Sequence, residues 1–461
     1  MATFGSHQFL GKKMKYISLA QTIEPHWFWD SFPLVSQSYA DGDEFQEFGF
    51  RWAGKGFTYA SAPGWHFKDQ PTLDDFQIEN FASIARVIDL TQSAKTGFIA
   101  AGDFTDKIGL GSLPKIIVLK TGHSDTIPMR RREYFTQIPK LAPAIAEIAA
   151  ERGVVHICVD FSCDSFKSRR VDFTQAINNP NSEFRDRAHS AGLIVTENLC
   201  NLDKIGSEVF LLCLPIKGEG MTTSPTRPVA LTKWPSDTPS IYDVSTPLLN
   251  HWRWRMEIWR DKSQSPDGFL DQTQYIQSGH AFTHCDAPRH MEQDGPTIQD
   301  LPNMGLDLFL GDATIIDISD IELPSPVTAD LLERRSGGNI KQNQRIILRS
   351  DLTNRLGYKS TRWHTHAPNI DASAADWLIA KKPDAICLDF PQDYIAREMP
   401  GRHVYNHEFE IHHKIFQAGI PFIEDLKDLG EIKQENIFLA AVPLKMVCVD
   451  GAPMRAVIIN W

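Results

Sequence analysis

The sequence predicts an α/β protein built from two consecutive copies of one domain. Two observations support this. Short apolar runs rich in β-branched residues alternate with stretches of helical spacing, and motifs recur at a nearly constant distance along the chain. The 461 residues suffice for two domains of ordinary size. A content of 42% hydrophobic and 23% charged residues is typical of a globular protein and not of a disordered or collagen-like chain.

The repeat is visible in several pairs of segments. His26-Trp27-Phe28-Trp29 recurs as His251-Trp252-Arg253-Trp254, which is 225 residues later. VVHICVDF matches DAICLDF at an offset of 229, and AGLIVTENL matches AGIPFIEDL at an offset of 227. Such a steady offset indicates a tandem duplication. We expect domains over residues 1–235 and 236–461, joined by the Pro/Ser-rich stretch TKWPSDTPS.

Each copy predicts the same elements in the same order. KIIVLKT, VVHICVDF, RIILRSD and DAICLDF are expected to be buried strands in mixed sheets. PKLAPAIAEIAAERG and PNIDASAADWLIAKK have helical spacing, and Asp371 or Ser373 is expected to cap the second helix. Gly192 and Gly419 are expected just past helix ends.

Charge and cysteine content exclude several classes of protein. The 47 basic and 58 acidic residues leave a net charge of −11, which disfavours a nucleic-acid or anionic-membrane surface. No apolar run approaches the ~20 residues needed to cross a bilayer, and the first twenty residues lack the order of a signal peptide. We therefore expect a cytoplasmic protein. The seven cysteines form no Cys-x-x-Cys pair, so buried reduced thiols are expected in place of a disulfide framework.

A group of potential metal ligands lies in the second copy, in SGHAFTHCDAPRH. His280, His284 and Asp286 share even spacing, so an extended strand would project all three from one side, with Cys285 on the opposite side. His290 lies beyond Pro288, so its direction is less certain. Two imidazoles and a carboxylate suit Zn, Mn or Fe(II).

A second contribution to this site is predicted further along the chain. His412 is expected on a helix that ends at Gly419, and Glu424 on the strand that follows. The pair would complete the first metal site, or would hold a second ion beside it with Asp286 as a bridge.

The first copy serves as an internal control. Lys55, Tyr59 and Ser61 replace His280, His284 and Asp286, Trp65 replaces His290, and Arg185 replaces His412; only Glu424 has its equivalent, in Glu197. The ligand set is thus present in one copy, which favours a functional role for it.

These motifs resemble those of a known family. His280-x-x-Thr283-His284-x-Asp286-Ala287-Pro288-x-His290 is similar to the signature of the metal-dependent cyclase family, which includes bacterial kynurenine formamidase and isatin hydrolase, and HHKIFQAGIPFIEDL is similar to its second motif. The resemblance implies two swivelling β/β/α domains that form an internal pseudo-dimer, and one or two Zn or Mn ions per chain. It also implies that His280, His284 and Asp286 bind one metal, that Asp286, His412 and Glu424 bind the other, and that His290 moves protons.

The predicted activity is hydrolysis of an amide, lactam or lactone in a small carbonyl substrate by a metal-activated hydroxide. Two alternatives stay open: a Lewis-acid cyclase, dehydratase or isomerase, and a non-catalytic relic. Phe282 stands where the family has glycine, which would reshape the pocket. Phe282, Trp252 and His407 are candidate substrate contacts, and the segment His26–Phe32 would either line the site or pack in the core. The pseudo-dimer could pair again as a homodimer.

Overall fold

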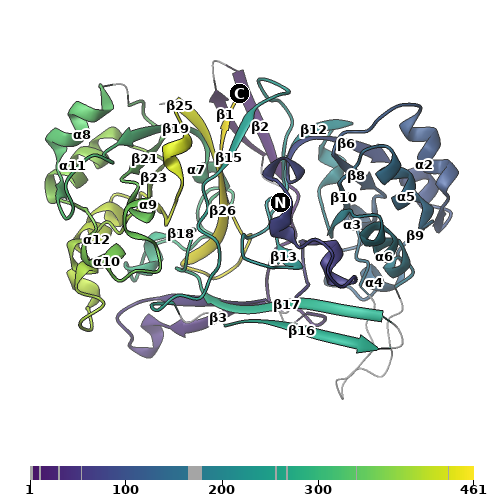
Figure 1. The fold of residues 1–461 in the computed structure, drawn as a ribbon, viewed down its shortest axis with the longest axis horizontal. Helices are drawn as coiled ribbons and strands as arrows, with labels where there is room; N and C mark the ends of the chain where they lie inside the picture. The colour runs from purple at the N-terminus through teal and green to yellow at the C-terminus, as the bar shows by residue number, and fades with distance from the viewer. Residues whose placement is uncertain are drawn as a thin grey trace.

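The computed structural model describes residues 4–9, 12–29, 32–52, 54–164, 179–254, 257–265, 268–338, 340–434 and 436–461. These residues form a mixed α/β structure, in which residues 1–235 (the first half) and 236–461 (the second half) lie side by side (Figure 1). Among the described residues, no helix is long and apolar enough to cross a membrane.

The second half contains a closed barrel of seven strands. Its sheet has the order β15-β26-β18-β24-β23-β21-β19-β25, and β25 also pairs with β26, which closes the ring. The seven strands of the ring are β18 (His284–Asp286), β19 (Leu310–Asp317), β21 (Arg345–Arg349), β23 (Ala385–Leu388), β24 (Phe422–Glu424), β25 (Asn436–Pro443) and β26 (Gly451–Asn460), and β15 (Ser240–Asp243) pairs with β26 outside the ring.

The first half repeats this strand order in an open sheet of ten strands. The order is β1-β2-β14-β12-β6-β8-β10-β11-β5-β13, where β13 and β14 together take the place of the single strand β26. The strands are β1 (Phe4–Phe9), β2 (Lys12–Ser18), β5 (Tyr59–Ser61), β6 (Ala82–Asp89), β8 (Ile116–Lys120), β10 (His156–Val159), β11 (Ile194–Glu197), β12 (Glu208–Leu212), β13 (Thr223–Pro225) and β14 (Val229–Leu231).

Helices cover the outer sides of both sheets (Figure 1). The first half has α1 (Thr91–Ala94), α2 (Ala101–Ile108), α3 (His123–Thr126), α4 (Glu133–Thr136), α5 (Ala144–Glu151) and α6 (Ser182–Ser190). The second has α7 (Leu306–Phe309), α8 (Ala329–Ser336), α9 (Leu352–Leu356), α10 (Arg362–Thr365), α11 (Ala372–Lys381) and α12 (Glu410–Gln417). Two small sheets pair β7 (Phe98–Ile99) with β9 (Lys140–Leu141) and β20 (Pro326–Val327) with β22 (Asn369–Ile370).

A four-stranded sheet joins the two halves and crosses beneath both of them in Figure 1. Its order is β16 (Glu257–Ser265), β17 (Gly268–Ser278), β4 (Glu47–Trp52) and β3 (Phe32–Gln37). In the central antiparallel pair, Arg51 lies opposite Ile276, which is its own counterpart 225 residues later. Such self-pairing is what a two-fold interface between two copies produces.

Other contacts between the halves are reciprocal in the same way. The Ile23 amide donates to the Lys445 carbonyl at 2.7 Å, and the Leu248 amide donates to the Lys217 carbonyl at 2.8 Å. Ile23 and Leu248 are repeat counterparts of each other, and so are Lys217 and Lys445. A buried apolar cluster that includes Phe210 and Ile459 packs the two sheets together.

Most of the elements expected from the sequence are present. The four buried strands and both helices form, and Asp371 is the residue that caps α11, because its side chain accepts from the Ala374 amide at 2.9 Å. Gly192 and Gly419 follow helix ends with φ of 81° and 75°. All seven cysteines are free thiols, five of them buried, Cys200 half-buried and Cys448 exposed.

Candidate metal centre

The predicted ligands come together from a turn, two adjacent strands and a helix of the second half. His284 and Asp286 lie on β18 and face the same side, because side chains two apart on a strand share a face. Glu424 lies on β24 directly opposite His284 in the ladder, and His412 lies on α12. The positions of His412 on a helix and Glu424 on the next strand agree with the sequence prediction.

The expected extended strand from His280 to Asp286 is wrong. β17 ends at Ser278 and β18 begins at His284, and the turn between them reverses the chain at Phe282, whose φ is 61°. Glycine adopts this left-handed conformation without strain, which explains why a glycine would suit the position. His280 therefore reaches the site from a turn. The even spacing correctly predicted that His280, His284 and Asp286 lie together, but they do not lie on one extended strand.

Close packing holds His280 in the turn. A Cβ on Gly451 would lie 2.5 Å from His280 Cε1, so only glycine leaves room for the imidazole there. The amide of Gly279 donates to the Phe48 carbonyl of the first half at 2.7 Å, which ties the same turn to β4.

The donor atoms form two groups that share Asp286. In the first, Asp286 Oδ1 lies 2.6 Å from His280 Nδ1 and 3.1 Å from His284 Nε2. In the second, His412 Nε2 lies 3.3 Å from Glu424 Oε1 and 4.0 Å from Asp286 Oδ2. The atoms within each group lie within 4.8 Å of one another, as ligands of one ion must. The side chains are buried, except that Glu424 is partly exposed to the cavity.

The hydrogen bonds of two histidines direct their Nε2 atoms at carboxylates. His284 Nδ1 donates to the Phe282 carbonyl at 2.6 Å, and His412 Nδ1 donates to Asp393 Oδ2 at 2.6 Å. Each Nε2 atom presents a lone pair once its proton has left, and the buried His284 Nε2 atom lies 3.1 Å from Asp286 Oδ1. A lone pair that faces carboxylate oxygens is stabilised when a cation lies between them. The residues therefore fit a divalent metal ion.

The electrostatics of the site agree with this fit. Burial alone would raise the pKa of Asp286, but His280 and His284 outweigh it and hold that pKa well below its usual range. Burial lowers the pKa of His412, but Asp393 and Glu424 outweigh burial and raise that pKa to about 10. The carboxylates thus favour positive charge at this place, whether protons or a metal supply it.

Three polar residues at the site were not predicted from the sequence. Asp450 Oδ2 lies 2.7 Å from His280 Nε2 and 3.0 Å from His290 Nδ1, and Asp393 holds His412. The Gln392 amide nitrogen lies 2.8 Å from His412 Nε2 and donates to Glu424. Asp393 had one available signal, since its repeat counterpart is also an aspartate, Asp164.

A cavity of about 720 Å³ opens onto these ligands, and both halves line it. The first half contributes residues of β3 and β4 and the loop between them, including Leu34, Val35, Phe45 and Glu47. The second half contributes the six predicted metal and proton-transfer residues together with Trp254, Trp363, Met399, His403, Val404 and Phe409. The walls are thus largely apolar and the polar groups gather at the ligands.

Both halves hold His290 in this cavity. Its Nδ1 atom lies 2.9 Å from the Gln46 carbonyl, and the Tyr39 hydroxyl donates to the His290 carbonyl at 3.0 Å. Its ring stacks on His280 with centroids 3.7 Å apart. With Nδ1 donating to oxygen atoms, Nε2 is the nitrogen available for proton transfer.

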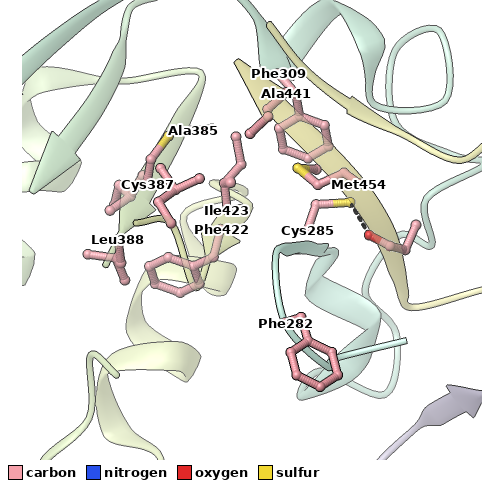
Figure 2. Close-up of a cluster of buried hydrophobic side chains, with 14 of the residues drawn as sticks. Phe282, Cys285, Phe309, Ala385, Cys387, Leu388, Phe422, Ile423, Ala441 and Met454 are labelled. Carbon is pink, nitrogen blue, oxygen red and sulfur yellow. Dashed lines mark hydrogen bonds between the residues drawn. The ribbon is translucent and has the colours of Figure 1, made fainter. Parts of the chain in front are cut away.

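The three predicted substrate contacts do not line the cavity. Phe282 is buried beside Tyr358, at 6.0 Å between ring centroids, and Figure 2 shows its ring apart from the labelled barrel residues. Trp252 is 43% exposed and packs edge-on against His364, whereas His407 stacks on Tyr405. Their contact with a substrate stays a prediction.

The aromatic segment near residue 26 follows the core alternative. Phe28 stacks on Phe135 with centroids 4.3 Å apart, and Trp29 packs against Phe57 at 5.2 Å. Residues 34–49, and not this segment, supply the wall from the first half.

Side-chain cations occupy the equivalent place in the first half. Arg185 Nη1 donates to Asp164 at 2.8 Å and to Glu197 at 2.9 Å, and Lys55 Nζ lies 3.1 Å from Asp164. Since Arg185 replaces His412 and Lys55 replaces His280, the protein itself provides the positive charge that a metal would provide in the second half.

Comparisons with known proteins show the family of the chain. Residues 17–165 and 220–392, more than half of the chain, match the family model described as "Cyclase: Putative cyclase". Kynurenine formamidase of Bacillus cereus (strain ATCC 10987 / NRS 248) is 28% identical over 228 residues, which is 50% of this chain and 91% of that protein. The kynurenine formamidase of Bacillus mycoides is equally similar over the same lengths.

Among solved structures, isatin hydrolase A from Labrenzia aggregata matches with a TM-score of 0.40 and 20% identity, over 48% of this chain and 94% of that one. The split match to the family model includes parts of both halves, among them the repeated segments VVHICVDF and DAICLDF, and it ends before His412 and Glu424. The chain therefore belongs to the Putative cyclase family.

Proposed function

We propose that this protein is a metal-dependent hydrolase that opens the amide, lactam or lactone bond of a small carbonyl compound. One observation carries the proposal: the donor atoms of His280, His284 and Asp286 are buried and lie within 4.8 Å of one another at the end of a cavity. The name of the formamidase relatives supports an amide as the bond that is cleaved.

The residues proposed to hold one or two divalent ions, Zn or Mn, are His280, His284, Asp286, His412 and Glu424. A bound ion supplies Lewis-acid polarisation of a carbonyl group and lowers the pKa of water. The first group of ligands is the stronger candidate, because the Gln392 amide nitrogen already lies 2.8 Å from His412 Nε2 and donates to Glu424 in the second group.

His290 is proposed to take the proton from the attacking water and return it to the leaving nitrogen or oxygen. Its Nδ1 is fixed by Gln46 and Asp450, so Nε2 is free for this transfer. An imidazole suits the task near neutral pH. The apolar side chains of the cavity would exclude water and orient the organic part of the substrate.

We also propose that the chain is an internal pseudo-dimer of units 1–235 and 236–461. The antiparallel self-pairing at Arg51 and Ile276 and the repeated strand order support this arrangement. In it, the first unit has lost the ligands and serves the second by walling the cavity with β3 and β4.

Turnover in ¹⁸O-labelled water tests the reaction type. Purified protein would be screened against formamides, lactams and lactones, with the His284→Ala/Asp286→Ala variant as control. A hydrolase must place one labelled oxygen in the acid product, and the variant should lose both turnover and the metal bound at the centre in the second half. Turnover without label would show a cyclisation, dehydration or isomerisation and would overturn the proposal.

A further inference from the structure

A second group of metal-type ligands lies in the first half, away from the cavity. His156 and Cys158 are on β10, and Cys213 directly follows β12. The donor atoms of these three residues lie within 4.8 Å of one another, and each side chain is fully buried. Cys158 and Cys213 belong to one buried apolar cluster of the first half.

The imidazole is oriented as a metal-binding imidazole would be. His156 Nδ1 donates to the Asn80 carbonyl at 2.9 Å, so Nε2 carries the lone pair that faces the thiols. Cys158 Sγ lies 3.6 Å from His156 Nε2. In metal sites, a histidine that donates one ring N–H to a backbone carbonyl is fixed in orientation, and its other ring nitrogen can bind the metal.

The second half shows that the fold does not require these polar groups. Ala385, Cys387 and Ala441 are the repeat counterparts of His156, Cys158 and Cys213. They pack in an apolar cluster with Ile423 and Met454 (Figure 2). An imidazole in an apolar core must be satisfied, and Asn80 and Thr196 satisfy His156 in this structure. The imidazole and the two thiols lie together in one copy only, with donor atoms close enough to bind one ion.

We propose that His156, Cys158 and Cys213 bind one zinc ion. Cysteine sulfur and histidine nitrogen are the preferred ligands of structural zinc. Binding would release the two thiol protons, and two thiolates would balance the charge of Zn²⁺, leaving a neutral group in the apolar core. Thr196 Oγ1, now 2.7 Å from His156 Nε2 and 3.4 Å from Cys213 Sγ, would exchange its bond to the imidazole for one to a thiolate.

The ion would cross-link strands that are not neighbours in the sheet. β10 and β12 are separated by β6 and β8, so the metal would tie the first half together independently of the proposed catalysis. The inference therefore does not rest on the proposed function.

Cobalt substitution distinguishes this site from the centre in the second half. The full chain would be produced with Co²⁺ in place of zinc, and the near-ultraviolet absorption of thiolate-bound cobalt would be measured. The centre in the second half has only nitrogen and oxygen donors, so this absorption reports sulfur ligands alone. About one equivalent of thiolate-bound cobalt per chain is expected, and its absence from the unaltered chain would overturn the proposal.

Variants identify the sulfur atoms. Cys158→Ser and Cys213→Ser should each abolish the absorption, whereas Cys387→Ser, the same change at the counterpart of Cys158, should retain it. In the His284→Ala/Asp286→Ala background, about one zinc per chain should remain. Absorption that persists in Cys158→Ser, or a thiol titration of the denatured chain that finds five thiols in place of the seven, would refute the site.

Discussion

Replacement of Asp393 by asparagine tests whether His412 is a ligand. Asp393 Oδ1 accepts from the Ile411 amide at 2.8 Å, and Oδ2 accepts from His412 Nδ1 at 2.6 Å. In Asp393→Asn, the remaining oxygen would stay on the Ile411 amide and the new amide nitrogen would face Nδ1. The ring would then have to accept at Nδ1 and carry its proton on Nε2, the atom that faces Glu424.

We expect this change to weaken metal binding about 10- to 100-fold, the usual effect of losing such a partner. In free energy this is about 1.4 to 2.7 kcal/mol, since each factor of ten corresponds to about 1.4 kcal/mol. Competition with a chromogenic chelator measures the affinity, and thermal unfolding of the metal-free protein verifies that the chain is folded.

The matched control is Asp164→Asn, the same change at the counterpart of Asp393 in the first half. Asp164 binds Arg185 and Lys55, so its replacement should lower stability and leave metal affinity unaltered. Equal affinity in Asp393→Asn and the unaltered chain would refute the reasoning, because His412 would then not be a ligand.

Three further predictions concern proton transfer, stability and pH. His290→Ala should keep its metal content and lose about 100-fold or more in turnover; an unchanged rate would remove His290 from the mechanism. Arg185→Ala leaves the buried Glu197 without its cationic partner and Asp164 with Lys55 alone, so urea unfolding should show a loss of about 3–5 kcal/mol with metal content unchanged; a loss below 1 kcal/mol would contradict the buried ion pair. The pKa of His412 is raised to about 10 in the metal-free protein, and the pKa values of His280 and His284 are raised too. Protons must therefore leave when metal binds, and affinity should rise by about tenfold or more per pH unit between pH 6 and 8; affinity independent of pH over that range would argue against ligation by these histidines.

Local patterns in the sequence were sufficient to group the proposed ligands. His284 and Asp286 share a strand face, and His412 and Glu424 belong to a helix and the strand after it. These relations depend on residues close together in the chain, where periodicity is informative. The repeat allowed the two copies to be compared: residues present in both copies were assigned to the fold, and the set present only in the second copy was proposed to bind metal.

Long-range packing decided what the sequence could not reveal. Asp450 contacts His290, which lies 160 residues earlier in the chain, and the absence of a side chain at Gly451 makes room for His280. Neither contact produces a recognisable pattern in the nearby sequence. The turn at Phe282 was missed because a left-handed phenylalanine has no sequence signature. The wall that β3 and β4 provide depends on pairing between the halves, which spacing within one copy does not predict.

The cavity wall from the first half and the proposed metal ligands lie far apart in the sequence. Residues 34–49 shape the cavity, whereas all five proposed metal ligands are encoded more than 200 codons downstream. Exchanging residues 33–52 between relatives would be expected to alter substrate preference and to spare the metal centre. In the proposed arrangement, changes to the cavity wall in one copy would alter substrate preference without touching the proposed metal ligands in the other.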